Sequence, residues 1–185
     1  MAKHTVVETT NLLASRFGKR IFDVVCDEDI DNGTFGYLGE QVEEGSHIYK
    51  FVKGFKAGEP VLMANAPAWD EDTCRITNQR RDKFFIPANT PFRGFELAKN
   101  DEFAITIEGV TAASQAKMKI GAFLTIDADS GKLVAADATA VKADSAPVME
   151  AVVERKRIVG GTLATAAHNY GYANEMFTAR IKVLG

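Results

Sequence analysis

The sequence contains little of what marks several large classes of protein. Its 185 residues include only two cysteines, Cys26 and Cys74, and no CxxC pair. We interpret both as reduced, half-buried thiols rather than a redox or metal site. No apolar run approaches 18 residues, so no transmembrane helix is predicted. The first residues lack the apolar stretch of a signal peptide, and we expect synthesis in a cytoplasm. A formal net charge of −3 does not suggest a dedicated nucleic-acid binder.

The motifs of common catalytic sites are also missing. There is no G-x-S-x-G, no G-x-x-x-x-G-K and no G-x-G-x-x-G. The segment 127–131 begins like a calcium loop, but its glycine is fifth and Ala138 stands at position twelve, where a bidentate Glu is needed. His4, His47 and His168 are far apart, without a second metal ligand at helical spacing. We therefore predict a protein that is not an enzyme, with no cofactor and no metal.

Charged clusters are present but have simple explanations. Acidic residues gather at 27–31 and 70–72, beside turn-forming residues, and we interpret both clusters as solvated loops. Basic residues gather at 80–83, followed by Phe84-Phe85, and at 155–157. Basic and aromatic residues together can bind single-stranded nucleic acid by stacking. The acidic net charge favours the other interpretation, in which the basic residues lie at solvated strand ends and the phenylalanines in the core.

The pattern of apolar residues predicts a mainly β fold. Fifteen glycines and five prolines divide the chain into short pieces, and several of these alternate apolar and polar residues with a period of two. We expect strands at 21–25, 47–55, 60–64, 83–86, 103–107 and 177–183. Short helices are expected at 10–17, 111–118 and 162–167. The predicted architecture is a compact β-barrel or sandwich.

Two further strand predictions concern the second half of the chain. Residues 122–136 predict a hairpin that turns at 129–131, where Gly131 takes the left-handed conformation. Residues 148–159 predict a long strand that is apolar in its first half and charged in its second. Such a strand would begin in the core and end in water.

The N-terminal part has a different character. Residues 1–20 hold four basic residues against one acid, although the whole chain is acidic. We predict an arm or extension at 1–45 and a β-rich body at 46–185. The alternative is that the segment forms the first strand and helix of the barrel. If it is an arm, the residues expected to contact a partner are Lys3, Val6, Val7, Leu12, Leu13, Arg16, Phe17, Lys19 and Arg20.

The order of features from residue 88 to the end resembles a known family. Phe92-Arg93-Gly94-Phe95-Glu96 precedes segments 101–110 and 120–126, the turn, and Gly131-Lys132-Leu133-Val134-Ala135. Segments 146–153 and 177–183 follow. This order is similar to that of the head decoration, or capsid cement, proteins of tailed bacteriophages. Gly121-Ala122 stands where that family's pattern has Gly-Asp.

The resemblance implies a "β-tulip"-like body and a non-enzymatic virion protein. It would bind the major capsid protein lattice on the capsid exterior, after assembly in the host cytoplasm. A cement protein bridges neighbouring subunits through many small contacts, and an arm that orders on docking adds more. The sequence is compatible with a monomer, a dimer or a trimer, and implies no membrane and no specific nucleic acid as partner. Two alternatives stay open: another virion component, such as a tail or fibre-base protein, and a small-ligand-binding β-barrel.

Overall fold

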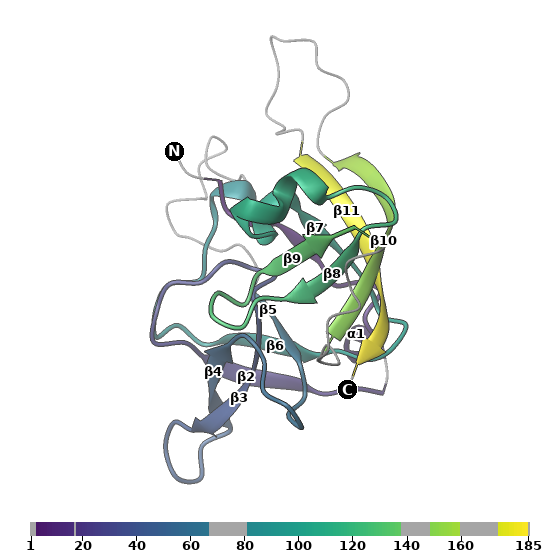
Figure 1. Cartoon of the computed structure of the whole chain (residues 1–185). Helices are drawn as coiled ribbons and strands as arrows, with labels where there is room; N and C mark the ends of the chain where they lie inside the picture. The colour runs from purple at the N-terminus through teal and green to yellow at the C-terminus, as the bar shows by residue number, and fades with distance from the viewer. Residues whose placement is uncertain (1–2, 17, 67–80, 138–148, 160–173, 185) are drawn as a thin grey trace.

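The described part of the computed structural model comprises residues 3–16, 18–66, 81–137, 149–159 and 174–184 (Figure 1). Within these ranges the chain is mainly β, with one short α-helix and short 3-10 turns, as predicted. The strands form a closed five-stranded barrel and a six-stranded sheet.

The barrel is built from the first half of the chain. Its strand order is β2-β4-β3-β5-β6, and it closes through antiparallel pairing of β2 with β6. β2 and β4 pair in parallel, whereas the other neighbours are antiparallel. The strands are β2 (Ile21–Val25), β3 (Phe35–Gln41), β4 (Ile48–Lys53), β5 (Leu62–Asn65) and β6 (Phe92–Glu96).

The six-stranded sheet takes one strand from the N-terminal segment and the rest from the second half of the chain. Its order is β1-β7-β11-β10-β8-β9, with antiparallel neighbours throughout. The strands are β1 (Val7–Glu8), β7 (Glu102–Thr106), β8 (Phe123–Ile126), β9 (Leu133–Ala136), β10 (Met149–Val159) and β11 (Asn174–Leu184). The helical elements are α1 (Leu13–Arg16) and the 3-10 turns η2 (Arg81–Lys83), η3 (Ile107–Gly109) and η4 (Ala112–Lys117).

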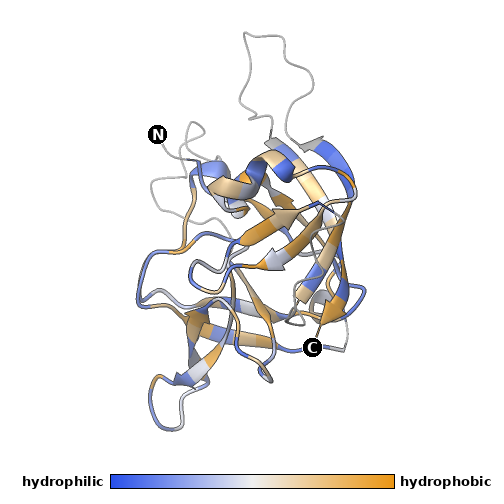
Figure 2. Cartoon of the chain, viewed as in Figure 1, coloured by the Kyte–Doolittle hydropathy of each residue, from blue (hydrophilic) through white to orange (hydrophobic). Residues whose placement is uncertain are grey.

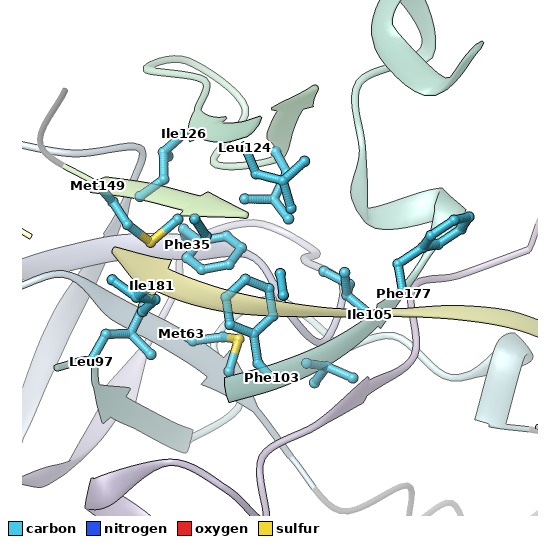
Figure 3. Packing of buried hydrophobic residues seen from close by; sticks show 14 of the residues in the cluster. Phe35, Met63, Leu97, Phe103, Ile105, Leu124, Ile126, Met149, Phe177 and Ile181 are labelled. Carbon is cyan, nitrogen blue, oxygen red and sulfur yellow. The ribbon is translucent and has the colours of Figure 1, made fainter. Parts of the chain in front are cut away.

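One large core joins the barrel to the sheet. Phe177, Ala179 and Ile181 of β11 point into it, and the polar residues between them point outward, as their alternation predicts. Phe35 of the barrel stacks edge-on against Phe103 of β7, with 5.6 Å between ring centroids (Figure 3). A smaller cluster fills the barrel interior. Because this core is shared, barrel and sheet form a single folded unit.

β5 is buried on both faces, which accounts for its run of consecutive apolar residues. Leu62 and Ala64 belong to the barrel interior, whereas Val61 and Met63 belong to the core between the barrel and the sheet. A strand that is buried on both faces reads as a continuous apolar run rather than an alternation. The wall shared by the two clusters therefore runs along β5.

The β8–β9 hairpin docks on the barrel through two glycines. Gly131, with φ +65°, accepts a hydrogen bond at its carbonyl from the Phe35 N–H, and the Gly54 N–H bonds to the Phe35 carbonyl. A Cβ on Gly131 would overlap the Phe35 carbonyl oxygen, and a Cβ on Gly54 would overlap that of Ala128. The predicted turn and its left-handed glycine are thus confirmed. The second glycine holds the turn against the barrel.

Several predicted elements differ from those observed. Of the helix predicted at 10–17, the described residues form one turn, Leu13–Arg16; Leu12 is buried and Leu13 is exposed, so the two leucines do not share one face. The predicted strand at 83–86 is a 3-10 turn followed by one isolated bridge, Ile30–Ile86. η4 is a 3-10 helix preceded by Thr111, whose hydroxyl bonds Ser114 rather than capping the turn. The helix predicted at 162–167 lies outside the described residues.

The prediction of an N-terminal arm at 1–45, separate from a body at 46–185, is wrong for the part that the structure describes. β1 pairs with β7, and β2 and β3 are two of the five barrel strands. The alternative interpretation, the first strand and helix of the barrel, is right in that the segment supplies β1 and α1, but β1 belongs to the six-stranded sheet and not to the barrel.

Candidate functional site

The N-terminal residues expected to contact a partner fall into two groups. Val6, Val7 and Leu12 are buried inside the protein and have no surface to offer. Leu13 is 42% exposed, and the basic residues of the segment are exposed. The exposed basic residues are Lys3, Arg16, Lys19 and Arg20. Phe17 lies outside the described residues. The buried apolar positions are therefore corrected from partner contacts to core residues.

Polar contacts fix this segment to the rest of the fold. The Asp31 carboxylate lies 2.7 Å from Nδ1 of His4 and accepts a hydrogen bond from the Thr5 hydroxyl. The His4 ring packs against Phe85. Further along, Lys19 donates to Glu96 at 2.8 Å. These contacts attach the N-terminal segment to the barrel strands and their loops.

Asp101 positions α1. Its buried carboxylate accepts the Leu13 N–H at 3.0 Å and the Ala98 N–H at 2.8 Å. Burial raises the pKa of this carboxyl, opposed by the two backbone hydrogen bonds. Leu13 is the first residue of α1, so the carboxylate satisfies an N–H that the helix itself cannot. The role of Asp101 is structural.

The segment that resembles the start of a calcium loop is a hydrogen-bonded turn. Asp127 accepts bonds from the backbone N–H and the hydroxyl of Ser130, and these bonds lower the pKa of Asp127. Its carboxylate is thus already committed to the hairpin. Position twelve of the loop, Ala138, lies outside the described residues.

The described residues of the 27–31 acidic cluster have separate partners. Asp27 pairs with Lys50, Glu28 with Lys53, and Asp29 accepts the Ala88 N–H. Among the residues that the structure describes, no three His, Cys, Asp or Glu side chains are grouped to hold a metal ion. The 70–72 cluster, His168 and Cys74 lie outside those residues. Cys26 is buried, more fully than predicted, and burial raises the pKa of its thiol.

The basic run at 155–157 leads to the most distinctive surface of the described structure. A β-bulge between Val153 and Arg155 inserts one extra residue into β10. Before the bulge the odd-numbered residues Ala151 and Val153 point into the core, and after it Arg155 contacts partners on the outer face. The charged half of this strand is blue in Figure 2. The bulge is what places Arg155 and Arg157 on the outer face, whereas Lys156 is the register partner of Phe177.

Two carboxylates from other strands bind the arginines of this run, and a third carboxylate, Glu154 of β10 itself, binds cations of β11. Arg155 bonds Glu102 of β7 at 3.0 Å, and Arg157 bonds Glu8 of β1. Arg180 of β11 contacts both Glu102 and Glu154, and Lys182 also reaches Glu154. We call this set the outer-face ion network; its members are Glu8, Glu102, Glu154, Arg155, Arg157, Arg180 and Lys182.

Five members of the network line a hollow in the sheet, here called the outer trough: Glu8, Glu102, Glu154, Arg155 and Arg157. Glu8, Ala104, Thr178 and Arg155 are register partners in one row across β1, β7, β11 and β10. The two central residues are small, and the two at the ends are long. The resulting hollow has a volume of about 410 Å³ and carries Ile120, 64% exposed, in its lining. The trough offers charge of both signs and one exposed apolar side chain, Ile120, besides the buried Phe103 and Ala104.

Sequence reasoning identified one side of this surface and missed the other. The run at 155–157 was predicted to be a solvated strand end, which is correct for the exposure of its side chains. Glu154 stands next to the run in the sequence, but Glu8 and Glu102 come from β1 and β7, so no local pattern links those two carboxylates to the run. The other basic run differs: Phe84 packs against the barrel cluster, as predicted, whereas Phe85 is exposed beside His4.

Comparison with known proteins adds no assignment. In the described residues, no helix is long and apolar enough to cross a membrane. No protein-family model, no curated protein and no solved structure matches the chain.

Proposed function

We propose that this chain is a non-enzymatic protein of a tailed-bacteriophage virion, which binds the outside of the head and stabilises the lattice of the major capsid protein. One observation supports this most. The segments that carry the resemblance fold as the consecutive strands β6 to β11, and five of these six form one continuous sheet. The resembling pattern therefore corresponds to a coherent structural unit rather than to scattered pieces.

The architecture suits a protein that works by area rather than through a deep pocket. The core shared by barrel and sheet holds the strands in fixed relative positions. A preorganised face loses less conformational entropy on binding. On a lattice, weak contacts made by many copies add up through effective concentration. The proposed location is the capsid exterior, reached after synthesis in the host cytoplasm, and the chain is compatible with monomers, dimers or trimers there.

The test uses virions released from cells that carry this sequence. Particles purified on a density gradient are analysed by quantitative mass spectrometry and by immunogold labelling with antibody against the recombinant chain. We expect the chain at many copies per particle, with gold over the head. Gold confined to the tail would favour the alternative of a tail or fibre-base component. Absence from purified virions would refute the proposal.

A second experiment tests stabilisation directly. Heads from a phage mutant that lacks the gene are mixed with recombinant chain and heated or diluted into low salt. We expect the added chain to sediment with the heads and to delay release of DNA. Heads that gain neither bound chain nor stability would contradict the proposed role.

A further inference from the structure

We propose that the outer face of the six-stranded sheet, centred on the outer trough, is the surface that binds the partner, and that it binds an acidic protein surface. The inference rests on the proposed function, because it takes the capsid lattice as that partner. It replaces the buried N-terminal residues as the contact site. Four features of the described residues carry it.

The first feature is the relative depth of the charges. The Arg155 side chain is 64% exposed, whereas its partner Glu102 is 18% exposed. Arg157 and Glu8 show the same order, 48% against 25%. The carboxylates therefore lie beneath the guanidinium groups. An approaching molecule meets the cations first.

The second feature is the local charge balance. The outer-face ion network holds four bases and three acids, so it carries an excess of one positive charge. The whole chain has a net charge of −3. The network is thus opposite in sign to the net charge of the whole chain. Such complementarity steers association with an acidic surface and fixes its orientation.

The third feature is the unused donor capacity of the arginines. A guanidinium has five N–H donors in a planar fork, and each of these two arginines gives one terminal nitrogen, Nη2, to its internal carboxylate. The remaining donors of Arg155 and Arg157 can bind a second carboxylate from a partner without breaking the internal pair. The internal glutamates hold the guanidinium groups in place, which reduces the entropy lost on binding.

The fourth feature separates a protein partner from a nucleic acid. Phosphates packed along a nucleic-acid backbone would meet Glu8, Glu102 and Glu154 at close range. A protein surface can place single carboxylates over the arginines and an apolar side chain against Ile120, which is exposed in the trough lining. Thr10 and Asn11, also in the lining, add neutral hydrogen-bonding groups. This mixture is typical of protein interfaces.

The experiment measures binding to heads of the phage mutant that lacks the gene, by co-sedimentation over a range of NaCl concentrations. The test variant is Arg155→Gln/Arg157→Gln. The matched control is Lys50→Gln/Lys53→Gln, which removes the same charge from β4, where both lysines form surface ion pairs. A second test variant, Ile120→Asp, places a negative charge in the trough at a residue that is 64% exposed and not needed for packing. Thermal melting verifies that all three remain folded.

We expect both trough variants to bind heads at least about tenfold more weakly, with a shallower salt dependence for the arginine variant, and the control to stay within about twofold of wild type. If wild type binds heads and the trough variants bind equally well, the surface is assigned wrongly while the proposed function stands. If wild type fails to bind heads, the proposed function and the proposed binding surface are both wrong. If wild type binds a duplex DNA fragment as tightly as it binds heads, the partner class is wrong.

Discussion

Gly131 meets two separate steric demands at one position. Its φ of +65° is a conformation that costs other residues about 1–2 kcal/mol, and its α-carbon faces the Phe35 carbonyl oxygen so closely that a Cβ would overlap it. Gly58 has a similar φ of +83° but nothing within 4 Å of the position a Cβ would take. Substitution at Gly58 therefore measures backbone strain alone, whereas substitution at Gly131 measures strain together with the overlap between Cβ and the Phe35 carbonyl.

We expect Gly131→Ala to lower the free energy of unfolding by clearly more than Gly58→Ala. The Gly58 variant carries only the strain of about 1–2 kcal/mol, whereas the Gly131 variant must also push the hairpin away from the barrel. Urea unfolding followed by circular dichroism measures both. Equal losses in the two variants would mean that the contact between hairpin and barrel contributes nothing.

A second residue-scale prediction concerns Asp127. Its hydrogen bonds from Ser130 lower its pKa in the folded state, so the folded protein binds the proton less tightly than the unfolded chain. The stabilisation is present above the unfolded value near pH 4 and is lost as the pH falls through the lower folded value. We expect wild type to melt above Asp127→Asn at neutral pH, and the gap to narrow in acid.

Asp129→Asn is the control for this pH dependence, because Asp129 is an exposed carboxylate in the same turn. Its melting temperature should follow that of wild type at each pH. A gap between wild type and Asp127→Asn that stays constant from neutral pH into acid would contradict the role assigned to the carboxylate.

At the scale of elements, α1 depends on a residue far away in the sequence. Asp101→Ala leaves the part-buried N–H of Leu13 and the buried N–H of Ala98 without their acceptor, and the buried unsatisfied group alone costs about 1–3 kcal/mol. We expect a loss of stability of that order, together with faster amide hydrogen exchange at residues 13–16. Lys99→Ala, at an exposed neighbouring position, should leave both quantities unchanged. Unaltered amide hydrogen exchange at residues 13–16 in the Asp101 variant would show that Asp101 does not anchor α1.

The elements show which features a sequence can predict. The alternation in β11 and the glycine turn between β8 and β9 are local signals, and both predictions were correct. Thr5-Val6-Val7 is a local strand signal for β1, but nothing local indicates its pairing with β7, which lies almost a hundred residues away. The bulge in β10 also has no signal in the sequence, although it places Arg155 on the outer face of the sheet. Half of the candidate site therefore depended on pairings that only the fold reveals.

At the scale of the whole molecule, the N-terminal segment is a structural part of the fold. Deleting residues 2–20 removes β1 and α1 and exposes the core around Leu12 and Val7. We expect the truncated chain to aggregate or to lose cooperative melting. Lys19→Ala/Arg20→Ala, which removes two basic side chains but keeps the core, should remain folded. A truncated chain that is soluble and melts cooperatively would restore the interpretation of this segment as an arm.

The position of β11 has a consequence for biosynthesis. The last described strand of the chain lies between β7 and β10, near the middle of the six-stranded sheet, and β1 is joined to that sheet only through β7. While residues 174–184 are still inside the ribosome, β7 lacks one neighbour and β10 lacks its longest pairing. The barrel strands are complete once residue 96 has emerged, but the face that covers them is not. Nascent chains therefore expose the apolar side of the barrel until residues 174–184 have left the ribosome, and this interval is when chaperone binding matters most.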